Sequence, residues 1–186
     1  MSLLEAIASR RSVGRVLPDP LPRAAVEALL EAAVAAPNHH LTAPWRFVVL
    51  AGDARREVGE AHARAVARAK PDLPAQGLAK EAARLERAPV VIAAIALGSD
   101  DPVQAREDRD AVAAAIENML LAAHGSGLGA MWRTGAMVDE REVREALGLA
   151  PGDAIVGFVY LGRPAGPPPE RPPRPDAGAV AAWRGW

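Results

Sequence analysis

An uninterrupted apolar run from Val90 to Leu97 is the feature that most restricts what this chain can fold into. The run, VVIAAIAL, contains no polar side chain, so neither face of the segment suits water. Its short length favours a strand, and burial on both faces places that strand at the centre of a sheet covered by helices on each side. Two other largely apolar segments, Phe47 to Leu50 and Ile155 to Leu161, predict further strands.

Helical periodicity fills the intervals between these segments. The helix predicted from Asp110 to His124 carries a continuous apolar face, which suits a core or an interface. Ser2 and Glu5 have capping-box spacing for a short first helix, and Asp53 and Asp139 are candidate N-caps of later helices. Further helices are predicted between Pro22 and Pro37, from Asp53 to about Lys70, from Ala75 to Arg87 and from Asp139 to Gly148. Because strands and helices alternate, we expect helices around a central, mixed sheet.

Length and composition predict a single domain. A chain of 186 residues that is 50% hydrophobic can bury one sizeable core, here expected over residues 1–164. Residues 165–186 begin with a proline-rich stretch and are expected to be an extension of the same domain. Only 4% of the residues are aromatic, so the core of one subunit is thin and an obligate dimer would supply the missing buried surface.

Charge and cysteine usage exclude several classes of protein. The net charge is −1, with acidic and basic residues interleaved, which argues against binding to nucleic acid. The absence of cysteine excludes disulfides, thiol catalysis and thiolate metal sites. We see neither a signal peptide nor a stretch long enough to cross a bilayer, so we expect a cytoplasmic protein with no membrane partner.

The tripeptide Arg10-Arg11-Ser12 follows the first predicted helix. Two guanidiniums and a hydroxyl suit a phosphate group, which arginine binds bidentately. The alternative is a solvated helix end, where the helix dipole favours cations.

The loop from Asn38 to Trp45 contains the adjacent pair His39 and His40. Two histidines suggest a metal, but we expect no carboxylate near them, cysteine is absent, and neighbouring histidines do not easily turn toward one ion. We therefore expect no metal site. The alternative role for the loop is a polar connector whose Pro44-Trp45 pair plugs the core.

Glycines at positions 125, 127, 129 and 135 mark a third segment. They could end a helix and start a strand, or they could let the backbone approach a flat ring. A dinucleotide-binding fingerprint would follow a strand, whereas these glycines follow a predicted helix. A Rossmann motif is therefore excluded.

The order and spacing of these three segments, followed by Gly157 to Pro164, resemble the nitroreductase family, in particular its short members. The resemblance extends from Arg10 to Pro164. It implies a nitroreductase-like α+β fold, with a mainly antiparallel or mixed sheet flanked by helices, in a domain-entwined homodimer. It also implies FMN as the cofactor, bound at the subunit interface.

The resemblance carries functional positions over to this chain. The positions matching those that hold FMN are Arg10, Arg11, Ser12, His39, Trp132, Arg133 and Thr134. Among them, the first three match the phosphate site, the histidine reaches a flavin shared between subunits, and the last three lie against the isoalloxazine ring. The positions matching the nicotinamide substrate segment are Ala122, Ala123, His124, Gly125, Ser126 and Gly127. Arg171 and Arg174 are candidates for a late basic residue at the phosphate, with a solvated tail as the alternative.

Two positions depart from the family pattern. Gly14 stands where a basic residue is common, and Arg15 is a candidate for that role beside the flavin N1 and C2 carbonyl. Leu41 stands where many members carry an asparagine that contacts the ring.

By resemblance, the protein is an FMN-dependent oxidoreductase that uses NAD(P)H to reduce nitroaromatics, quinones or similar flat electrophiles by a ping-pong reaction. Flavin N5 would carry the chemistry, so no side chain is expected to be catalytic. The alternatives are a specialised flavin enzyme of the same fold (a dehydrogenase, a dehalogenase or a flavin-degrading enzyme) and a non-catalytic flavin-binding module.

Overall fold

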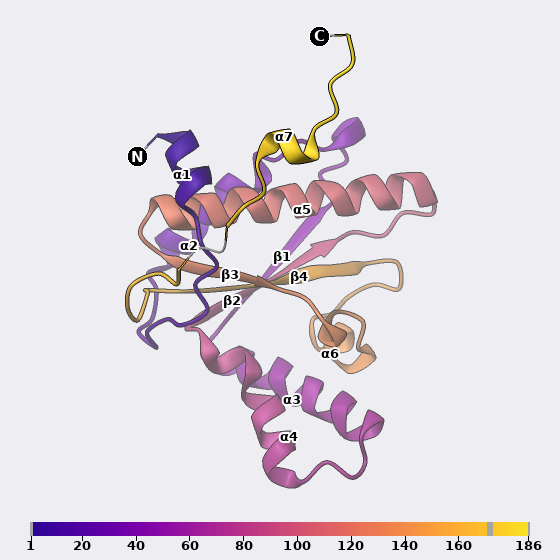
Figure 1. Ribbon diagram of the computed structural model, residues 1–186. Helices are drawn as coiled ribbons and strands as arrows, with labels where there is room; N and C mark the ends of the chain where they lie inside the picture. Colours follow the sequence, from indigo (N-terminus) through magenta and orange to yellow (C-terminus); the bar gives the residue numbers. More distant parts are fainter. Residues whose placement is uncertain (1, 171–172, 186) are drawn as a thin grey trace.

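The structure, a computed structural model, describes residues 2–170 and 173–185. It contains a four-stranded sheet with helices on both faces (Figure 1). The strands are β1 (Trp45–Ala51), β2 (Val90–Ala96), β3 (Gly129–Arg133) and β4 (Ala154–Gly162). They lie in the order β1-β2-β4-β3, and each neighbouring pair is antiparallel. The α+β fold is as predicted, and the sheet is antiparallel in every pairing between these strands.

The antiparallel pairing follows from the connections. Between β1 and β2 the chain forms two helices, α3 (Asp53–Ala69) and α4 (Ala75–Ala82), and returns to the end of the sheet that it left, where Ala51 pairs with Val90. The single helix α5 (Pro102–Gly125) then joins β2 to β3, which run parallel but are separated by β4. Alternation of strands and helices predicts such a crossover but not the insertion of β4 between its two strands.

Strand β2 is the centre of the sheet, as its sequence predicts. All of its residues are buried, and it pairs with β1 on one side and β4 on the other. Its side chains alternate between the two helical layers, with Ile92 on the α5 side and Ile95 on the α3 side.

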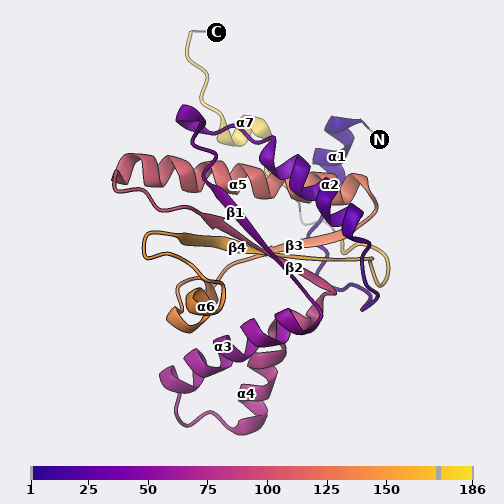
Figure 2. The ribbon, with the colours of Figure 1, turned by 180° about the vertical axis from the view of Figure 1, so that it is seen from behind.

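Helices α2 (Arg23–Val34) and α5 pack together on one face of the sheet (Figure 2). The apolar face predicted for α5 belongs to the core of the single chain, because Ile116, Met119 and Leu120 are buried there. Burying each such side chain contributes about 1.5–3 kcal/mol. A subunit interface on α5 must therefore use its other faces.

The opposite face of the sheet carries α3 and α6 (Arg141–Ala146), and α4 packs on α3 farther from the strands. Residues Ala83–Arg87 form a 3₁₀ turn, η2, so the helix predicted over Ala75 to Arg87 ends as an α-helix at Ala82. The buried His62 of α3 joins this layer, with Nδ1 2.6 Å from a Glu140 oxygen and Nε2 3.2 Å from a Glu81 oxygen.

The predicted aspartate caps in this layer are wrong. The N-cap of α3 is Gly52, whose φ of 56° favours glycine, and Asp53 is already inside the helix, where its charge suits the helix dipole. The N-cap of α6 is Glu140 rather than Asp139, and no side chain caps it among the described residues.

The N-terminal segment begins with α1 (Leu3–Ser9), and the predicted capping box is present. Glu5 donates its backbone N–H to Ser2 Oγ at 3.2 Å, and Ser2 donates its own to Glu5 at 2.7 Å. Beyond α1 the chain follows the edge of the sheet, where Val13 donates to the Ala130 carbonyl at 2.9 Å. The segment therefore extends from the α5 layer to strand β3.

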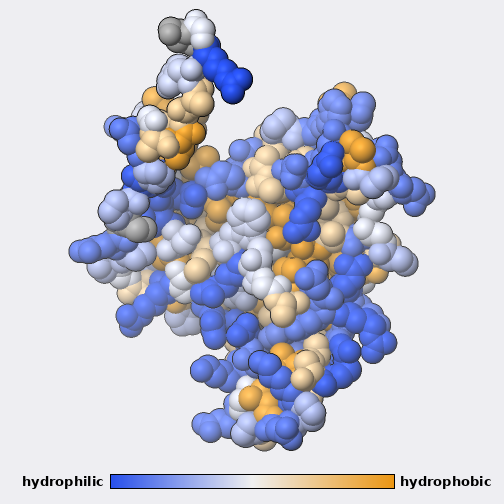
Figure 3. All heavy atoms as spheres, turned by 45° about the vertical axis from the view of Figure 1, so that its right-hand side comes forward, coloured by the Kyte–Doolittle hydropathy of each residue, from blue (hydrophilic) through white to orange (hydrophobic). Residues whose placement is uncertain are grey.

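The C-terminal segment contains one short helix, α7 (Ala177–Val180). The C-terminal segment projects from the body of the molecule in Figure 3. Val180 and Trp183 are 74% and 72% exposed, so this segment adds little to the core of its own chain. Within the described residues, none of the helices has both the length and the apolar character required to cross a membrane.

Candidate active site

Arg10, Arg11 and Ser12 line a hollow with residues of the C-terminal segment. This Arg10 hollow has a volume of about 390 Å³, and its lining is Arg10, Arg11, Ser12, Pro169, Glu170, Pro173, Arg174 and Pro175. Arg174 donates to the Ile7 carbonyl at 3.3 Å. Among the described residues, the hollow thus gathers three guanidiniums and one hydroxyl against a single lining carboxylate, which favours an anionic ligand. Arg171 lies outside the described residues.

The two adjacent arginines have different surroundings. Arg10 is only 21% exposed in its side chain, and its Nε lies 3.0 Å from Glu117 of α5. Arg11 donates through Nη1 to the Ser9 carbonyl at 2.5 Å and to the Arg10 carbonyl at 2.9 Å. Arg11 therefore binds the carbonyls at the helix end, as the helix-end alternative predicts, whereas α5 holds Arg10 in place.

Gly14 lies where the N-terminal segment meets β3. A Cβ atom at Gly14 would stand 2.9 Å from Met131 Sδ and 3.4 Å from Arg133 Nη2. The space that a side chain at position 14 would use is therefore bordered by the Arg133 guanidinium. Arg15 lines a hollow together with Gly14 and Ala165 to Pro167, and its carbonyl accepts from Ala165 at 3.1 Å.

Arg133 lines a second cavity, which lies on the α3 face of the sheet. This Arg133 cavity has a volume of about 210 Å³, and its lining is His62, Arg84, Arg87, Arg133, Thr134, Ala136, Met137, Phe158 and Tyr160. The Arg133 guanidinium lies 5.4 Å from the centroid of the Tyr160 ring. Burial raises the pKa of the Tyr160 phenol, and the three arginines oppose that rise. The three arginines thus make the lining of the cavity cationic, although Glu81 is paired with Arg84.

Sequence analysis missed Arg84, Arg87 and Tyr160 as lining residues. Both arginines are largely exposed and belong to a segment of alternating charges, which is typical of a solvated helix face. Arg84 is also paired with Glu81. No local signal distinguishes these arginines from their neighbours, because only the folded chain brings residues of η2, β3 and β4 to one cavity.

The three residues predicted to face the flavin ring do not all lie on the same side of the sheet. Trp132 packs on the α5 side of the sheet, whereas Arg133 pairs with Phe158, whose side chain belongs to the core on the α3 side. The Trp132 indole lies against Gly157 with Nε1 buried, and this nitrogen has no hydrogen-bond partner in the described part of the chain. Thr134 follows the strand and is exposed.

The segment predicted to meet the nicotinamide substrate forms the end of α5 and the turn after it. His124 Nε2 lies 2.8 Å from Ser9 Oγ, so this segment adjoins the Arg10 hollow. The Ala123 methyl is fully buried in the core, whereas Gly125, Ser126 and Gly127 are exposed. Arg133 and Thr134 lie at the other end of β3.

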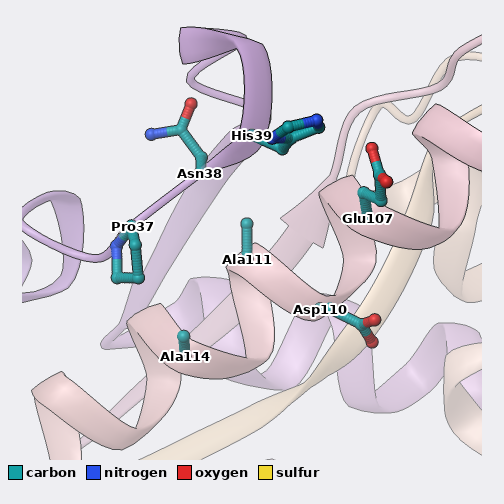
Figure 4. Close-up of a pocket in the computed structure, with 7 residues that line it drawn as sticks. All are labelled: Pro37, Asn38, His39, Glu107, Asp110, Ala111 and Ala114. Carbon is teal, nitrogen blue, oxygen red and sulfur yellow. The ribbon is translucent and has the colours of Figure 1, made fainter.

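His39 begins the 3₁₀ turn η1 (His39–Leu41) and lines a third hollow, of about 480 Å³. This His39 hollow is lined by Pro37, Asn38, His39, Glu107, Asp110, Ala111 and Ala114 (Figure 4). The expectation that no carboxylate stands near the histidines is wrong, because α5 brings Glu107 to the loop. Leu41 is 87% exposed, so its side chain contributes little to its own chain's core.

Within one chain, His39 does not meet the Arg10 hollow. Glu107 lines the His39 hollow, and Glu117 contacts Arg10, ten positions further along α5. At about 1.5 Å per residue the two places are roughly 15 Å apart along the helix. His39 and Arg10 therefore line separate hollows of one chain.

Comparison with known proteins agrees with this fold. The model of the nitroreductase family matches residues 7–163. YdjA of Escherichia coli (strain K12), named as an NAD(P)H nitroreductase, is 34% identical over 166 residues, which cover 88% of this chain and 89% of YdjA. A nitroreductase-like family protein from Bacillus cereus has a TM-score of 0.87 at 25% identity, covering 100% of this chain and 97% of that one. A nitroreductase from Desulfovibrio desulfuricans, crystallised in complex with FMN, has a TM-score of 0.76 at 26% identity, covering 100% and 98%.

The fold and these matches define an oxidoreductase of the nitroreductase type. The chain belongs to the nitroreductase family.

Proposed function

We propose that this protein is an FMN-dependent oxidoreductase that uses NAD(P)H to reduce nitroaromatics, quinones or similar flat electrophiles. The observation that carries the proposal is the pair of cationic sites at the two ends of the segment from Arg10 to Gly14. FMN has a phosphate at one end and a ring that becomes anionic on reduction at the other. The Desulfovibrio relative named above was crystallised with FMN.

The Arg10 hollow fits the phosphate. Arg10 is oriented by Glu117 through Nε, which leaves the terminal nitrogens of its guanidinium for a phosphate oxygen. Ser12 supplies a hydroxyl and Arg174 a further cation from the C-terminal segment. Glu170 in the lining offsets part of this charge but leaves the hollow positive.

The Arg133 cavity fits the pyrimidine end of the flavin ring. When bound, FMN supplies hydride transfer at N5. Negative charge on reduced flavin gathers at N1 and the C2 carbonyl, and a preorganised cation beside these atoms favours the reduced state. We assign this role to Arg133, because its guanidinium would lie 3.4 Å from a Cβ atom at position 14, where the family commonly has a basic residue. Arg15 lines a different hollow, with Gly14 and residues of the C-terminal segment. Arg84 and Arg87 strengthen the field in the same cavity.

The exposed turn Gly125 to Gly127 is proposed to contact NAD(P)H, which would leave before the acceptor enters the same place in a ping-pong sequence. No side chain needs to act as a nucleophile or a strong base in this reaction. The residues of this chain bind and orient the reactants and tune the electrostatic potential at the ring.

The functional unit is proposed to be a homodimer in which His39 of one subunit completes the site of the other. The distance between His39 and Arg10 along α5 supports this arrangement. Leu3, Leu4 and Ile7 of α1 are exposed apolar side chains that a second subunit could cover. An obligate interface of this kind buries more than about 2,000 Å² in total.

The absorbance spectrum of the purified protein, followed by its oxidation of NADH or NADPH with and without an acceptor, tests the activity. A flavin spectrum with acceptor-dependent turnover supports the enzyme. A bound flavin that NAD(P)H does not reduce would indicate the non-catalytic binding module instead.

A subunit-mixing experiment tests the shared site. Variants Arg10→Ala and His39→Ala are each expected to be impaired, and their mixed dimers should regain function. About a quarter of all sites should be intact, because half of randomly paired dimers are mixed and each mixed dimer has one intact site of two. No recovery after co-refolding would show that each site is built within one chain.

A further inference from the structure

The His39 hollow brings together three side chains with the chemistry of metal ligands. Ligand atoms of His39, His40 and Glu107 all lie within 4.8 Å of one another. The histidines come from the η1 turn and the carboxylate from α5, so only the folded chain assembles the group. We propose that His39, His40 and Glu107 form a binding site for a divalent transition-metal ion of the zinc type.

The backbone of η1 explains how two neighbouring histidines can face one ion. His40 has φ 56° and ψ 12°, in the left-handed region that non-glycine residues rarely adopt. In extended or right-handed helical backbone, consecutive side chains point apart. Here the two imidazole rings have centroids 3.9 Å apart and planes inclined at 51°. The objection that adjacent histidines diverge therefore does not hold for this pair.

The unusual loop conformation is fastened at both ends. Thr42 donates its hydroxyl to Asp108 at 2.8 Å, and Asp108 is only 4% exposed on α5. The Asn38 side chain accepts the backbone N–H of Ala43 at 3.0 Å. Ala43 also has a positive φ, of 46°. Strained backbone of this kind persists where the surrounding structure holds it and is frequent at ligand sites.

The ligand set selects the class of ion. Two imidazoles and one carboxylate suit zinc and its neighbours in the first transition series, whereas magnesium and calcium prefer oxygen ligands alone. With bonds of about 2.1 Å, two ligands of one ion lie at most about 4.2 Å apart, so the group must close slightly. His39 and His40 are exposed, so no buried packing opposes that small movement. Water can complete the coordination.

Figure 4 shows the ring of His39 and the carboxylate of Glu107 on the same side of the hollow, with Asp110 pointing away from the loop. A bound ion would occupy His39, which the proposed function assigns to the flavin of the partner subunit. The consequence for regulation rests on that proposed function. Metal binding and flavin contact would compete for one imidazole, so the ion would act as an inhibitor of the reductase.

The test uses full-length, flavin-loaded protein that has been freed of metal with a chelator. Calorimetric titration with Zn²⁺ measures stoichiometry and affinity, and electron paramagnetic resonance of added Cu²⁺ detects ligand nitrogens. We expect one ion per chain and a nitrogen pattern from two imidazoles. Variants His40→Asn and Glu107→Gln should each lower the affinity for Zn²⁺ by at least about tenfold, since even outer-shell changes cost 10–100-fold.

Glu31→Gln is the matched control, because Glu31 is an exposed carboxylate of α2 outside the hollow. Unchanged Zn²⁺ affinity in both His40→Asn and Glu107→Gln would overturn the proposal, as would an equal loss in Glu31→Gln. The flavin absorbance recorded during the titration separates the two proposals. Binding of Zn²⁺ without a change in that absorbance supports the metal site and contradicts the contact between His39 and the flavin.

Discussion

Replacing Arg10 with alanine tests the proposed phosphate site most directly. Arg10 is the arginine that α5 orients through Glu117, with an Nε–Oε1 distance of 3.0 Å and a side chain 21% exposed. Its loss removes at least one charge-assisted hydrogen bond to phosphate, which contributes about 1.5–3 kcal/mol. At 1.4 kcal/mol for each factor of ten, the dissociation constant for FMN should rise by about tenfold to a hundredfold. The lower end is expected, since Arg11, Ser12 and Arg174 remain in the hollow.

The assay is quenching of flavin fluorescence as FMN is titrated into apoprotein. The stability of the apoprotein should change little, because the Arg10–Glu117 pair is partly exposed and such pairs contribute about 0–1 kcal/mol. Arg23→Ala is the matched control, since Arg23 is 91% exposed and pairs with Glu27 away from the hollow. If Arg10→Ala bound FMN as tightly as the parent and Arg23→Ala, the phosphate would have to lie elsewhere.

Three other outcomes can be checked. Gly157→Ala should destabilise the fold by about 1–3 kcal/mol in denaturant unfolding, because the new Cβ would stand 2.0 Å from Trp132 Nε1. The control Gly166→Ala should be neutral, because a Cβ atom at Gly166 has no neighbour within 4 Å among the described residues. The raised pKa of Tyr160 favours the folded state below the ordinary value of 10.0, and this contribution is lost as pH rises through the raised pKa. Unfolding measured between about pH 9 and 11 should show that loss in the parent and not in Tyr160→Phe, and equal slopes would contradict it. Truncation after Pro164 removes Arg174 from the Arg10 hollow and should weaken FMN binding by about tenfold, while an unchanged affinity would show that the tail is dispensable.

Much of the secondary structure could be predicted from the sequence, because its causes are local. The apolar run of β2, the helical periodicity of α5 and the capping box at Ser2 each depend on residues a few positions apart. At the start of α3 the N-cap is Gly52, which has a positive φ, so the prediction that Asp53 caps this helix was wrong by one residue. The resemblance to the nitroreductase family was also visible in the sequence, since it rests on the order and spacing of short motifs along this chain, and the family model confirms it.

What the sequence could not show is which distant side chains share a cavity. Arg84 and Arg87 lie about fifty residues before Arg133, and they share a cavity with it only because η2 packs against α3 on the same face of the sheet. Packing of α5 against the η1 turn likewise brings Glu107 close to His39 and His40, and the three side chains together form a candidate metal site. The antiparallel sheet likewise depends on β4 lying between β2 and β3. Local propensity determines where helices and strands form, whereas long-range packing of apolar faces decides which charged groups those elements bring together.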